Sequence, residues 1–325
     1  MREIRYIDAI REAMAEEMRR DESVFVFGEG IGPRGGNFTQ TKGMFVEFGE
    51  KRLIDTPISE LGFTGLAVGA AMTGLRPIVD YMFWDFAFEA AGQIIDSAGR
   101  IHYISNGGFK VPLVMRGVIG AAQSAGGHHS GSPYPLYAQM PGLKVVIPST
   151  PRDAKGLLKT AIRDDDPVLV FEHRGLYNMK GLVPEEEYTT PLGQADVRRE
   201  GTDVTVIATS RMVHVALKAA DHLEEEGIST EVIDPRTLVP LDKGMILDSI
   251  RKTKRVVVVD EAYGPCGVGG EIAALAADEA FYYLDSPIKR VHSLSMPAPY
   301  APPLEKAMVP DVERVVVAVG DVMSQ

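Results

Sequence analysis

The sequence predicts an α/β protein built of two three-layer domains, each with a mostly parallel sheet covered by helices. Patterns of buried strands alternate with helical patterns along the whole chain, which is typical of this class. The length of 325 residues is about twice that of an average domain. Hydrophobic residues make up 45% and charged residues 24%, so the chain can form a large core and is not expected to be disordered.

The first half of the chain begins with an amphipathic helix and continues with four strands. Apolar side chains at helical spacing predict the helix, and they are Ile7, Ile10, Met14 and Met18. The predicted strands are residues 24–27, 52–55, 76–82 and 111–116, and the longest helical stretches are residues 62–75 and 86–103. Ligands of such sheets usually bind beyond the carboxyl ends of the strands. We therefore expect the functional site in the loops that follow strands, at residues 28–36, 56–60, 82–86 and 119–132.

A polar segment from Asn178 to Arg199, which contains two prolines and three consecutive glutamates, predicts a linker between the domains. A second alternating set follows it. Its predicted strands are residues 204–209, 230–233, 256–259 and 315–319, and its helices are residues 213–226, 243–251 and one that begins near Gly270. The predicted domains are therefore residues 1–185 and 186–325.

Charge and cysteine content restrict the class of protein. Lys and Arg number 34 against 45 for Asp and Glu, which gives a net charge of −11 and disfavours binding to nucleic acid or to anionic membranes. The single cysteine, Cys266, excludes an internal disulfide. No apolar signal segment follows the charged first residues, and no stretch approaches the length of a membrane span. We expect a soluble cytoplasmic protein that binds a basic partner.

The run Asp55-Thr56-Pro57-Ile58-Ser59-Glu60 leaves a predicted strand and ends where a glycine-rich apolar helix begins. Two interpretations of Glu60 are open. It is either a solvated first-turn residue that the helix dipole stabilises, or a poorly hydrated carboxyl with a raised pKa, suited to sharing a proton.

Two further loops carry candidate site residues. The run Met82 to Phe88 is the densest aromatic cluster and holds the single tryptophan, Trp84, so it is either core or a platform for a stacked ring. The glycine-rich loop around His128 and His129 suggests either metal binding or acid–base chemistry. Adjacent residues point in different directions and no third ligand stands at motif spacing, so acid–base chemistry is favoured over zinc.

Several runs along the chain form one pattern. They are Gly28-Glu29, the run from Asp55 to Glu60, Gly74-Leu75-Arg76-Pro77, His129-Ser130, Pro141-Gly142-Leu143-Lys144-Val145-Val146, Asp153-Ala154-Lys155-Gly156-Leu157-Leu158 and Asp234-Pro235-Arg236-Thr237-Leu238. With them the chain resembles the β subunit of the E1 component of 2-oxo acid dehydrogenase complexes, from its first helix almost to its C-terminus. That family includes the pyruvate, branched-chain and acetoin enzymes.

The resemblance implies a transketolase-like pyrimidine-binding domain followed by a transketolase C-terminal domain, with thiamine diphosphate as the cofactor. Glu60 matches the catalytic glutamate that hydrogen-bonds the aminopyrimidine ring nitrogen, and Phe86 matches the aromatic residue that packs on this ring. The other residues implied around the ring are Glu29, Ile58, Ser59 and Met82.

The resemblance also implies a substrate region and a cation site. The residues implied to face the substrate are Phe83, Trp84, Asp85, Phe86 and His129, and His129 is implied to transfer a proton. The backbone carbonyls of Leu113, Ala161, Ile162, Asp164 and Asp166 match a potassium site. A turn before the next strand is the competing interpretation of the aspartate run.

Thiamine enzymes hold the diphosphate through Mg²⁺ with a Gly-Asp-Gly run followed by an asparagine. This chain has no Gly-Asp-Gly, and its asparagines are Asn37, Asn106 and Asn178. The resemblance therefore implies that an E1 α subunit holds Mg²⁺ and the diphosphate in an α₂β₂ heterotetramer. The basic peripheral subunit-binding domain and the lipoyl domain of the E2 acyltransferase would be further partners.

The implied function is oxidative decarboxylation of a 2-oxo acid with acyl transfer to lipoyl-E2, catalysed by an oxidoreductase. Three alternatives remain open: an acetoin dehydrogenase β subunit, half of a transketolase-like transferase, and a scaffold subunit without catalysis. The aromatic run at residues 83–86 offers no basic side chain for a sugar phosphate, and the presence of Glu60, Phe86 and His129 argues against the scaffold.

Overall fold

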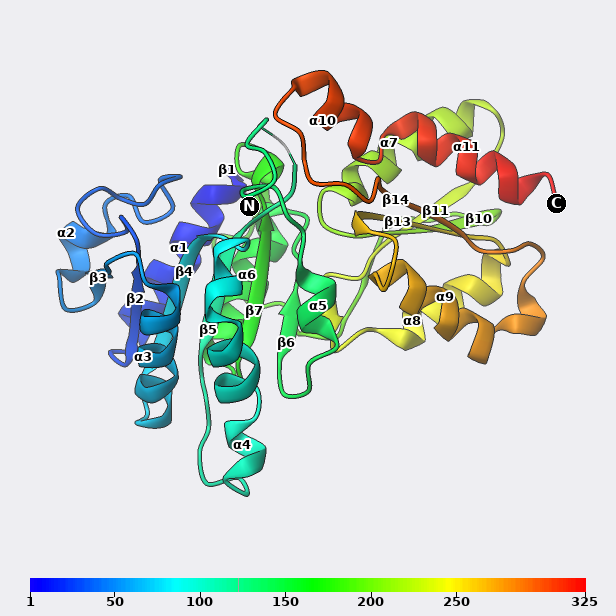
Figure 1. Cartoon of the computed structure of the whole chain (residues 1–325). Coiled ribbons are helices and arrows are strands. Elements are labelled where there is room, and N and C mark those ends of the chain that lie inside the picture. Colours follow the sequence, from blue (N-terminus) through cyan, green and yellow to red (C-terminus); the bar gives the residue numbers. More distant parts are fainter. Residues whose placement is uncertain (122) are drawn as a thin grey trace. The chain divides into compact units, whose positions relative to one another are not determined.

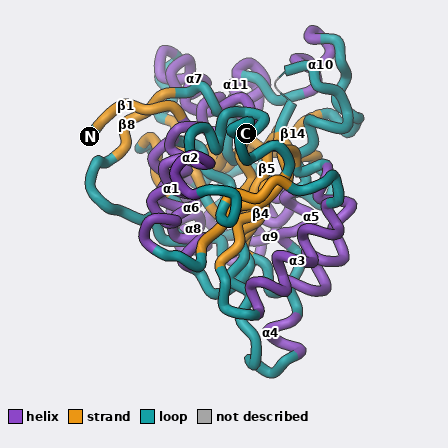
Figure 2. The backbone as a smooth tube through the Cα atoms, turned by 90° about the vertical axis from the view of Figure 1, so that its left-hand side faces the viewer, coloured by secondary structure: helices purple, strands orange, loops and turns teal. Residues whose placement is uncertain are grey.

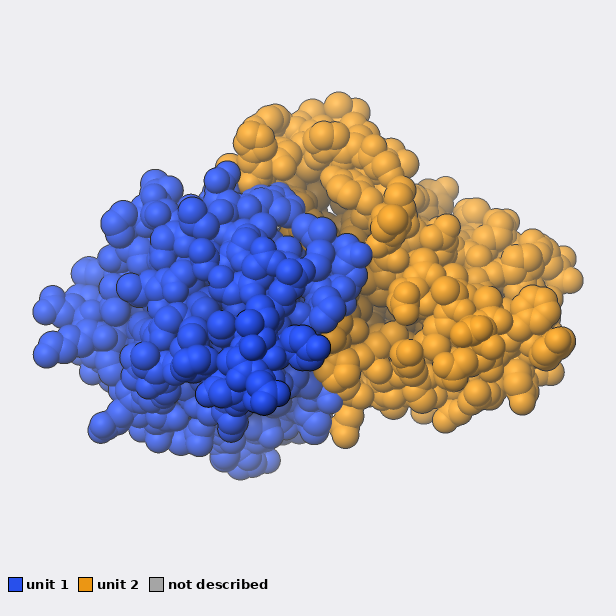
Figure 3. Space-filling view, turned by 60° about the horizontal axis from the view of Figure 1, so that its bottom comes forward, with its two compact units in different colours: residues 1–119, 136–192 blue, residues 120–135, 193–325 orange. Residues whose placement is uncertain are grey.

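A computed structural model of the chain describes residues 1–121 and 123–325. The chain forms two compact units, coloured separately in Figure 3. Unit 1 consists of Met1–Ile119 and Leu136–Leu192, and unit 2 of Gly120–Pro135 and Gly193–Gln325. All residues after Leu192 therefore belong to unit 2. The short internal segment Gly120–Pro135, which carries both candidate histidines, also groups with unit 2.

Unit 1 is built on six parallel strands in the order β6-β7-β5-β4-β2-β3. Their bounds are Val24–Gly28 (β2), Leu53–Asp55 (β3), Arg76–Phe83 (β4), Val114–Ile119 (β5), Lys144–Val146 (β6) and Val168–His173 (β7). A separate antiparallel pair joins β1 (Arg2–Arg5) to β8 (Lys180–Val183). All four strands predicted for the first half of the chain are confirmed, and the predicted linker contains β8.

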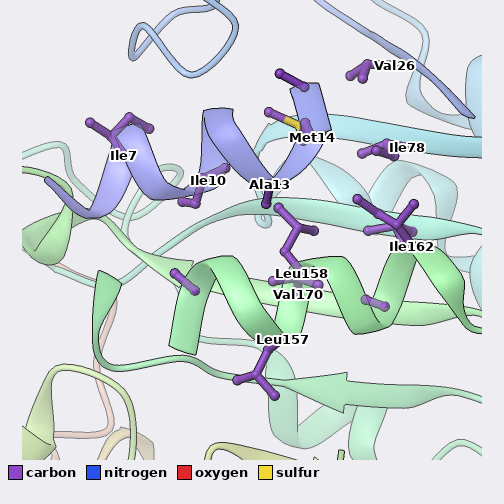
Figure 4. Packing of buried hydrophobic residues seen from close by; sticks show 14 of the residues in the cluster. Ile7, Ile10, Ala13, Met14, Val26, Ile78, Leu157, Leu158, Ile162 and Val170 are labelled. Atoms are coloured by element: carbon purple, nitrogen blue, oxygen red, sulfur yellow. The ribbon is translucent and has the colours of Figure 1, made fainter. Parts of the chain in front are cut away.

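Helices cover both faces of this sheet. The helices α1 (Tyr6–Arg20) and α6 (Pro151–Arg163) lie on one side, and α3 (Glu60–Met72) lies on the other (Figures 1 and 2). Apolar side chains such as Ile10 and Leu158 fill the space under α1 and α6 (Figure 4). The shorter helices are α2 (Met44–Phe48), α4 (Ile101–Ile104), α5 (Tyr134–Ala138), η1 (Phe86–Ala90), η2 (Gln93–Ala98) and η3 (Arg174–Leu176).

The helical stretch predicted over residues 86–103 is confirmed as helical, but the structure divides it into the three pieces η1, η2 and α4. Gly92 and Gly99 flank the middle piece, and glycine weakens a regular helix. The Gly99 amide donates to the carbonyl of Ile94, five residues earlier, which is the π-helical pattern.

Unit 2 has a five-stranded sheet in the order β14-β13-β10-β11-β9, in which only the edge strand β9 is antiparallel. The strands are Asp196–Arg199 (β9), Val204–Ala208 (β10), Thr230–Asp234 (β11), Val256–Tyr263 (β13) and Lys289–Ser293 (β14), and Thr237–Val239 forms β12. The helices are Met212–Glu225 (α7), Lys243–Thr253 (α8), Val268–Glu279 (α9), Phe281–Tyr283 (η4), Pro302–Met308 (α10) and Val312–Met323 (α11).

The prediction of a strand at residues 315–319 is wrong, because these residues lie in α11. Asp311 caps this helix by accepting a hydrogen bond from the Arg314 amide at 2.9 Å. The buried side chains follow helical spacing, so packing overrides the strand preference of the valines. Among the described residues no helix is long and apolar enough to cross a membrane.

Candidate functional site

The carboxyl ends of three neighbouring strands of unit 1 bring the candidate residues together. Gly28 at the end of β2 pairs with Asp55 on β3 and with Asp80 on β4. Glu29 directly follows β2, and Glu60 opens the helix after β3. Parallel strands end at the same edge of a sheet, so these residues lie together at one edge, which is where the sequence predicts the functional site.

The Glu60 carboxyl lies at the first turn of α3 and is only 8% exposed. Within the part of the chain that the structure describes, no group hydrogen-bonds this carboxyl. The helix dipole favours a negative charge at this position, whereas burial disfavours it. Glu60 is therefore a carboxyl with unused hydrogen-bonding capacity, ready for a ligand.

Glu29 is electrostatically coupled to Glu60. Burial of the Glu29 carboxyl raises its pKa above the ordinary value, and the negative charges of Glu60 and Asp80 raise it further. The backbone of Glu29 is held in place because the Asn37 amide donates to its carbonyl at 3.1 Å. The raised pKa of Glu29 and the neighbouring charge of Glu60 make this pair a candidate for proton exchange with a ligand.

A fully buried ionic network lies directly behind this pair. The Arg116 guanidinium contacts the Asp80 carboxylate and donates from Nε to Glu172 at 2.7 Å. Tyr177 donates to Glu172 at 2.7 Å, and Gln40 donates to Asp80 at 2.8 Å. Sequence reasoning missed this network. The available signal was the presence of charged residues inside apolar strands, since a buried charge requires a partner.

The network also fixes Met82, one of the residues expected around the ring. The Met82 amide donates to Asp80 Oδ1 at 2.9 Å, and Met82 has a φ of 65°, which is unusual for a residue other than glycine. The strand pairing shifts register between Asp80 and Phe83. This irregularity turns the end of β4 and sets the start of the aromatic run.

The aromatic run divides into site residues and core residues. Phe83 and Phe86 are half-buried and pack edge to face, with ring centroids 5.7 Å apart. Trp84 is fully buried, donates from Nε1 to the Val170 carbonyl at 3.0 Å and stacks on Phe171 at 4.0 Å. The expectation that Trp84 faces the substrate is therefore wrong, because its indole is enclosed by the core. Asp85 is half-buried.

The other expected residues lie in different environments. Ile58 is 83% exposed and Ser59 is exposed, both just before α3. His129 is half-buried and His128 is exposed, and both belong to unit 2. The His129 amide donates to the Gly126 carbonyl at 3.2 Å, which forms a turn.

The carbonyls expected to bind potassium are already engaged in part. The Arg76 guanidinium donates to the carbonyls of Ile162 and Asp164 at 3.1 and 2.9 Å. The Leu113 carbonyl accepts from Val168, and the Ala161 carbonyl accepts from Asp164. Lys144 binds the side chains of Asp164 and Asp166 at 2.8 and 3.0 Å. A potassium ion would have to share these oxygens with the positive charge of Arg76.

Among the described residues, no group of three or more His, Cys, Asp or Glu side chains is arranged to hold a metal ion. What this site does offer is an electrostatically coupled pair of carboxyls, Glu29 and Glu60, and the half-buried aromatic rings of Phe83 and Phe86 at the end of β4. Such an arrangement can bind a heteroaromatic ring that has a basic nitrogen.

Comparisons with known proteins show the family to which the chain belongs. Residues 2–180 match the family described as "Transketolase, pyrimidine binding domain", and residues 193–315 match "Transketolase, C-terminal domain". The chain is 46% identical over 318 residues to the 2-oxoisovalerate dehydrogenase subunit beta of Bacillus subtilis, with 97% of each chain covered.

Two further relatives and one solved structure are similar over nearly the whole chain. The Rickettsia felis pyruvate dehydrogenase E1 component subunit beta is 47% identical, with 97% of each chain covered. The Bacillus subtilis acetoin:2,6-dichlorophenolindophenol oxidoreductase subunit beta is 46% identical, with 95% of this chain and 94% of the relative covered. A structure of a split-gene transketolase, an inactive β₄ tetramer, has a TM-score of 0.81 at 23% identity and covers 99% of this chain and 98% of its own. This last likeness concerns the fold.

Proposed function

Since the chain belongs to the family of E1 β subunits with transketolase-type pyrimidine-binding and C-terminal domains, we propose that it serves a thiamine diphosphate-dependent 2-oxo acid dehydrogenase. The proposed reaction is oxidative decarboxylation of a 2-oxo acid, with transfer of the acyl group to lipoyl-E2. One observation supports this most strongly: the buried, unpartnered Glu60 carboxyl is coupled to Glu29 at the strand ends.

The residues of unit 1 fit the aminopyrimidine end of thiamine diphosphate. Glu60 would hold the ring through its basic nitrogen, and its open hydrogen-bonding capacity suits that contact. Phe86, half-buried beside Phe83, would pack on the ring, and Met82 is held in its unusual conformation nearby. An aromatic face and one carboxyl are sufficient to orient a planar heterocycle.

When bound, thiamine diphosphate supplies the nucleophilic carbon and the electron sink that decarboxylation requires. The chain itself would contribute the side chains that donate and accept the proton. Glu60 would donate a proton to the ring nitrogen and take it back, and the negative charge of Glu60 raises the pKa of the neighbouring Glu29 carboxyl. Glu60 is buried and Glu29 is half-buried, which limits the access of water to this exchange and strengthens their mutual interaction.

We propose that an α subunit completes the site in an α₂β₂ heterotetramer and holds Mg²⁺ and the diphosphate. The absence of a Gly-Asp-Gly run from the sequence supports this division. The outward face of α3 supports it too, because Leu61 and Leu66 are 54% and 61% exposed on a helix that is apolar all round. Such a helix is usually covered on both faces.

The E2 acyltransferase is the proposed second partner, through its basic peripheral subunit-binding domain and its lipoyl domain. The net charge of −11 supports attraction to a basic domain. We assign His129 to proton transfer and substrate contact, including the acyl transfer to the lipoyl group. A half-buried imidazole in a glycine-rich loop can both accept and donate a proton, which supports that assignment.

We also propose a structural potassium ion at the carbonyls beside Arg76. Potassium should then raise the melting temperature of the tetramer above its value in sodium at equal ionic strength. Equal melting temperatures in the two salts would mean that no potassium ion binds here and that Arg76 alone supplies the positive charge at these carbonyls.

Acetoin cleavage is the second candidate function, and the 46% identity to an acetoin-oxidoreductase β subunit favours keeping it. The same residues would serve this reaction, since the proton exchange at the ring is identical. The two candidates differ in the substrate pocket, to which the α subunit also contributes.

The test is co-expression of the chain with its α subunit, followed by a ferricyanide-coupled assay with thiamine diphosphate and Mg²⁺. Pyruvate, branched-chain 2-oxo acids and acetoin are offered in turn. We expect the purified tetramer to oxidise at least one 2-oxo acid and the isolated chain to be inactive. Turnover of acetoin alone would select the second candidate, and activity of the isolated chain would refute the division of the site.

A further inference from the structure

The segment of residues 123–135, here named the histidine segment, is attached to unit 2 by backbone hydrogen bonds to buried glutamates. The Ser124 amide donates to Glu305 Oε1 at 2.9 Å, and the amide of the nearby Ala121 donates to Glu261 Oε1 at 2.7 Å. Both acceptors are less than a tenth exposed. A hydrogen bond to a carboxylate is stronger than a neutral one, and burial strengthens it further.

The conformation of the segment depends on the bond to Glu305. Ser124 has a φ of 54°, in the left-handed region that residues other than glycine rarely adopt. Two residues later Gly126 has a φ of 75°, and a Cβ added there would lie 2.3 Å from ring atoms of Tyr300. Gly126 then accepts the hydrogen bond from His129. A chain of contacts therefore runs from Glu305 through Ser124 and Gly126 to His129, so a shift of Ser124 would displace His129.

The other end of the segment is anchored separately. The buried Tyr134 hydroxyl donates to Asp260 Oδ1 at the carboxyl end of β13 and lies 3.5 Å from Thr209 Oγ1. The Gly120 amide donates to the Gly131 carbonyl at 3.1 Å, which closes the base of the loop. The Glu305 bond therefore fixes the first end of the segment and the Tyr134 contact fixes the last end, with His129 between the two anchors.

We propose that Glu305 is a positioning residue for His129, holding the histidine segment to unit 2 through the Ser124 amide. The importance of this positioning of His129 for turnover rests on the proposed function, in which His129 transfers a proton. Glu261 also faces Arg211 at 3.6 Å, whereas within the described residues the Ser124 amide is the one hydrogen-bond partner found for the Glu305 carboxylate. A displacement of about 1 Å at a reacting group can cost about 100-fold in rate.

The experiment compares α₂β₂ tetramers that carry Glu305→Ala, Glu305→Gln or the control Glu225→Ala. Glu225 is an exposed glutamate on α7 of the same unit. We expect Glu305→Ala to lower kcat about 10- to 100-fold, with the cofactor Kd and the melting temperature nearly unchanged. Glu305→Gln should restore kcat to within about threefold, because its carbonyl oxygen can still accept from Ser124.

A readout independent of activity is hydrogen exchange of residues 123–135, measured by mass spectrometry. We expect exchange in this segment to be about tenfold faster in Glu305→Ala than in the control. If exchange and kcat are both unchanged, the proposal is overturned. An equal loss in the Ala and Gln variants also overturns it, because the hydrogen bond would then be irrelevant.

An inactive parent tetramer would refute the proposed function alone, since the exchange measurement still decides whether Glu305 orders the segment. If Glu305→Ala does not assemble, Glu305→Asp takes its place, because it keeps the carboxylate but shortens the side chain that reaches the Ser124 amide at 2.9 Å. We expect it to speed exchange over residues 123–135 and lower kcat several-fold, and parental exchange and kcat in that variant would overturn the proposal.

Discussion

Replacement of Glu60 by glutamine tests the core of the proposed mechanism. Glutamine has nearly the same shape and can donate a hydrogen bond, but it cannot give up or accept a proton at the ring nitrogen. Acid–base catalysis contributes about 10²- to 10⁴-fold, so the variant should lose about 2.7 to 5.4 kcal/mol of transition-state stabilisation. Exchanging a charged hydrogen bond for a neutral one costs about 1–2 kcal/mol, so cofactor affinity should fall about 5- to 30-fold.

The assay measures ferricyanide-coupled turnover at saturating cofactor, together with the cofactor Kd by calorimetry, for the reconstituted tetramer. Glu22→Gln is the matched control, because Glu22 is an exposed glutamate of the same unit. Loss of the Glu60 charge should also lower the pKa of Glu29, since that charge is one cause of its elevation. Carboxyl resonances of labelled glutamate would report this shift.

Near-normal turnover of Glu60→Gln at saturating cofactor would refute the reasoning, because a side chain that cannot exchange protons would then suffice. Loss of cofactor binding without loss of turnover at saturation would reduce Glu60 to a binding residue. An unchanged Glu29 resonance would show that the two carboxyls are not coupled.

Three other substitutions test the surroundings of the site. Trp84→Phe should destabilise the chain by about 2–4 kcal/mol in urea unfolding followed by circular dichroism, because it leaves a buried carbonyl unpaired and a small cavity, and it should leave the KM for substrate unchanged. The pKa of Glu29 is raised in the folded protein, so its charge destabilises the fold above that pKa. Glu29→Gln should therefore raise the melting temperature at pH 8, with a gain that vanishes below the ordinary value of 4.5. Arg116→Met should cost about 3–5 kcal/mol, measured in the same urea experiment, because Asp80 and Glu172 would remain buried without a counter-charge. A loss below 1 kcal/mol would show that these carboxyls become protonated at little cost.

The sequence was sufficient to predict the alternation of strands and helices and the strand-end position of Glu29 and Glu60. Both follow from local patterns, since apolar runs mark the strands and parallel strands end at one edge. The wrong predictions have their cause in tertiary contacts, which local sequence patterns do not show. Residues 315–319 have a strand-like composition, yet the Asp311 cap and the packing of one face make them helical. Trp84 lies between two site residues in sequence, but its indole points into the core.

Long-range contacts account for what the sequence could not reveal. Gly120–Pro135 follows a strand of unit 1, yet it groups with unit 2, where it contacts Glu261, Glu305 and Asp260. Those partners lie more than 100 residues later in the chain. No local pattern encodes such pairs, so the histidines could be recognised as candidates but their supports could not.

The balance of charge around the site connects the buried network to the chemistry. Glu29, Glu60, Asp80 and Glu172 provide four carboxylates, and Arg116 provides the one guanidinium that contacts this set through Asp80 and Glu172. Arg116 neutralises the inner carboxylates enough for the fold to tolerate them, but it leaves an excess of negative charge at the outer pair. That excess favours a protonated ring nitrogen over a neutral one. The inner network therefore does more than hold Met82, because the charge of Asp80, which Arg116 balances, is one of the causes that raise the pKa of Glu29.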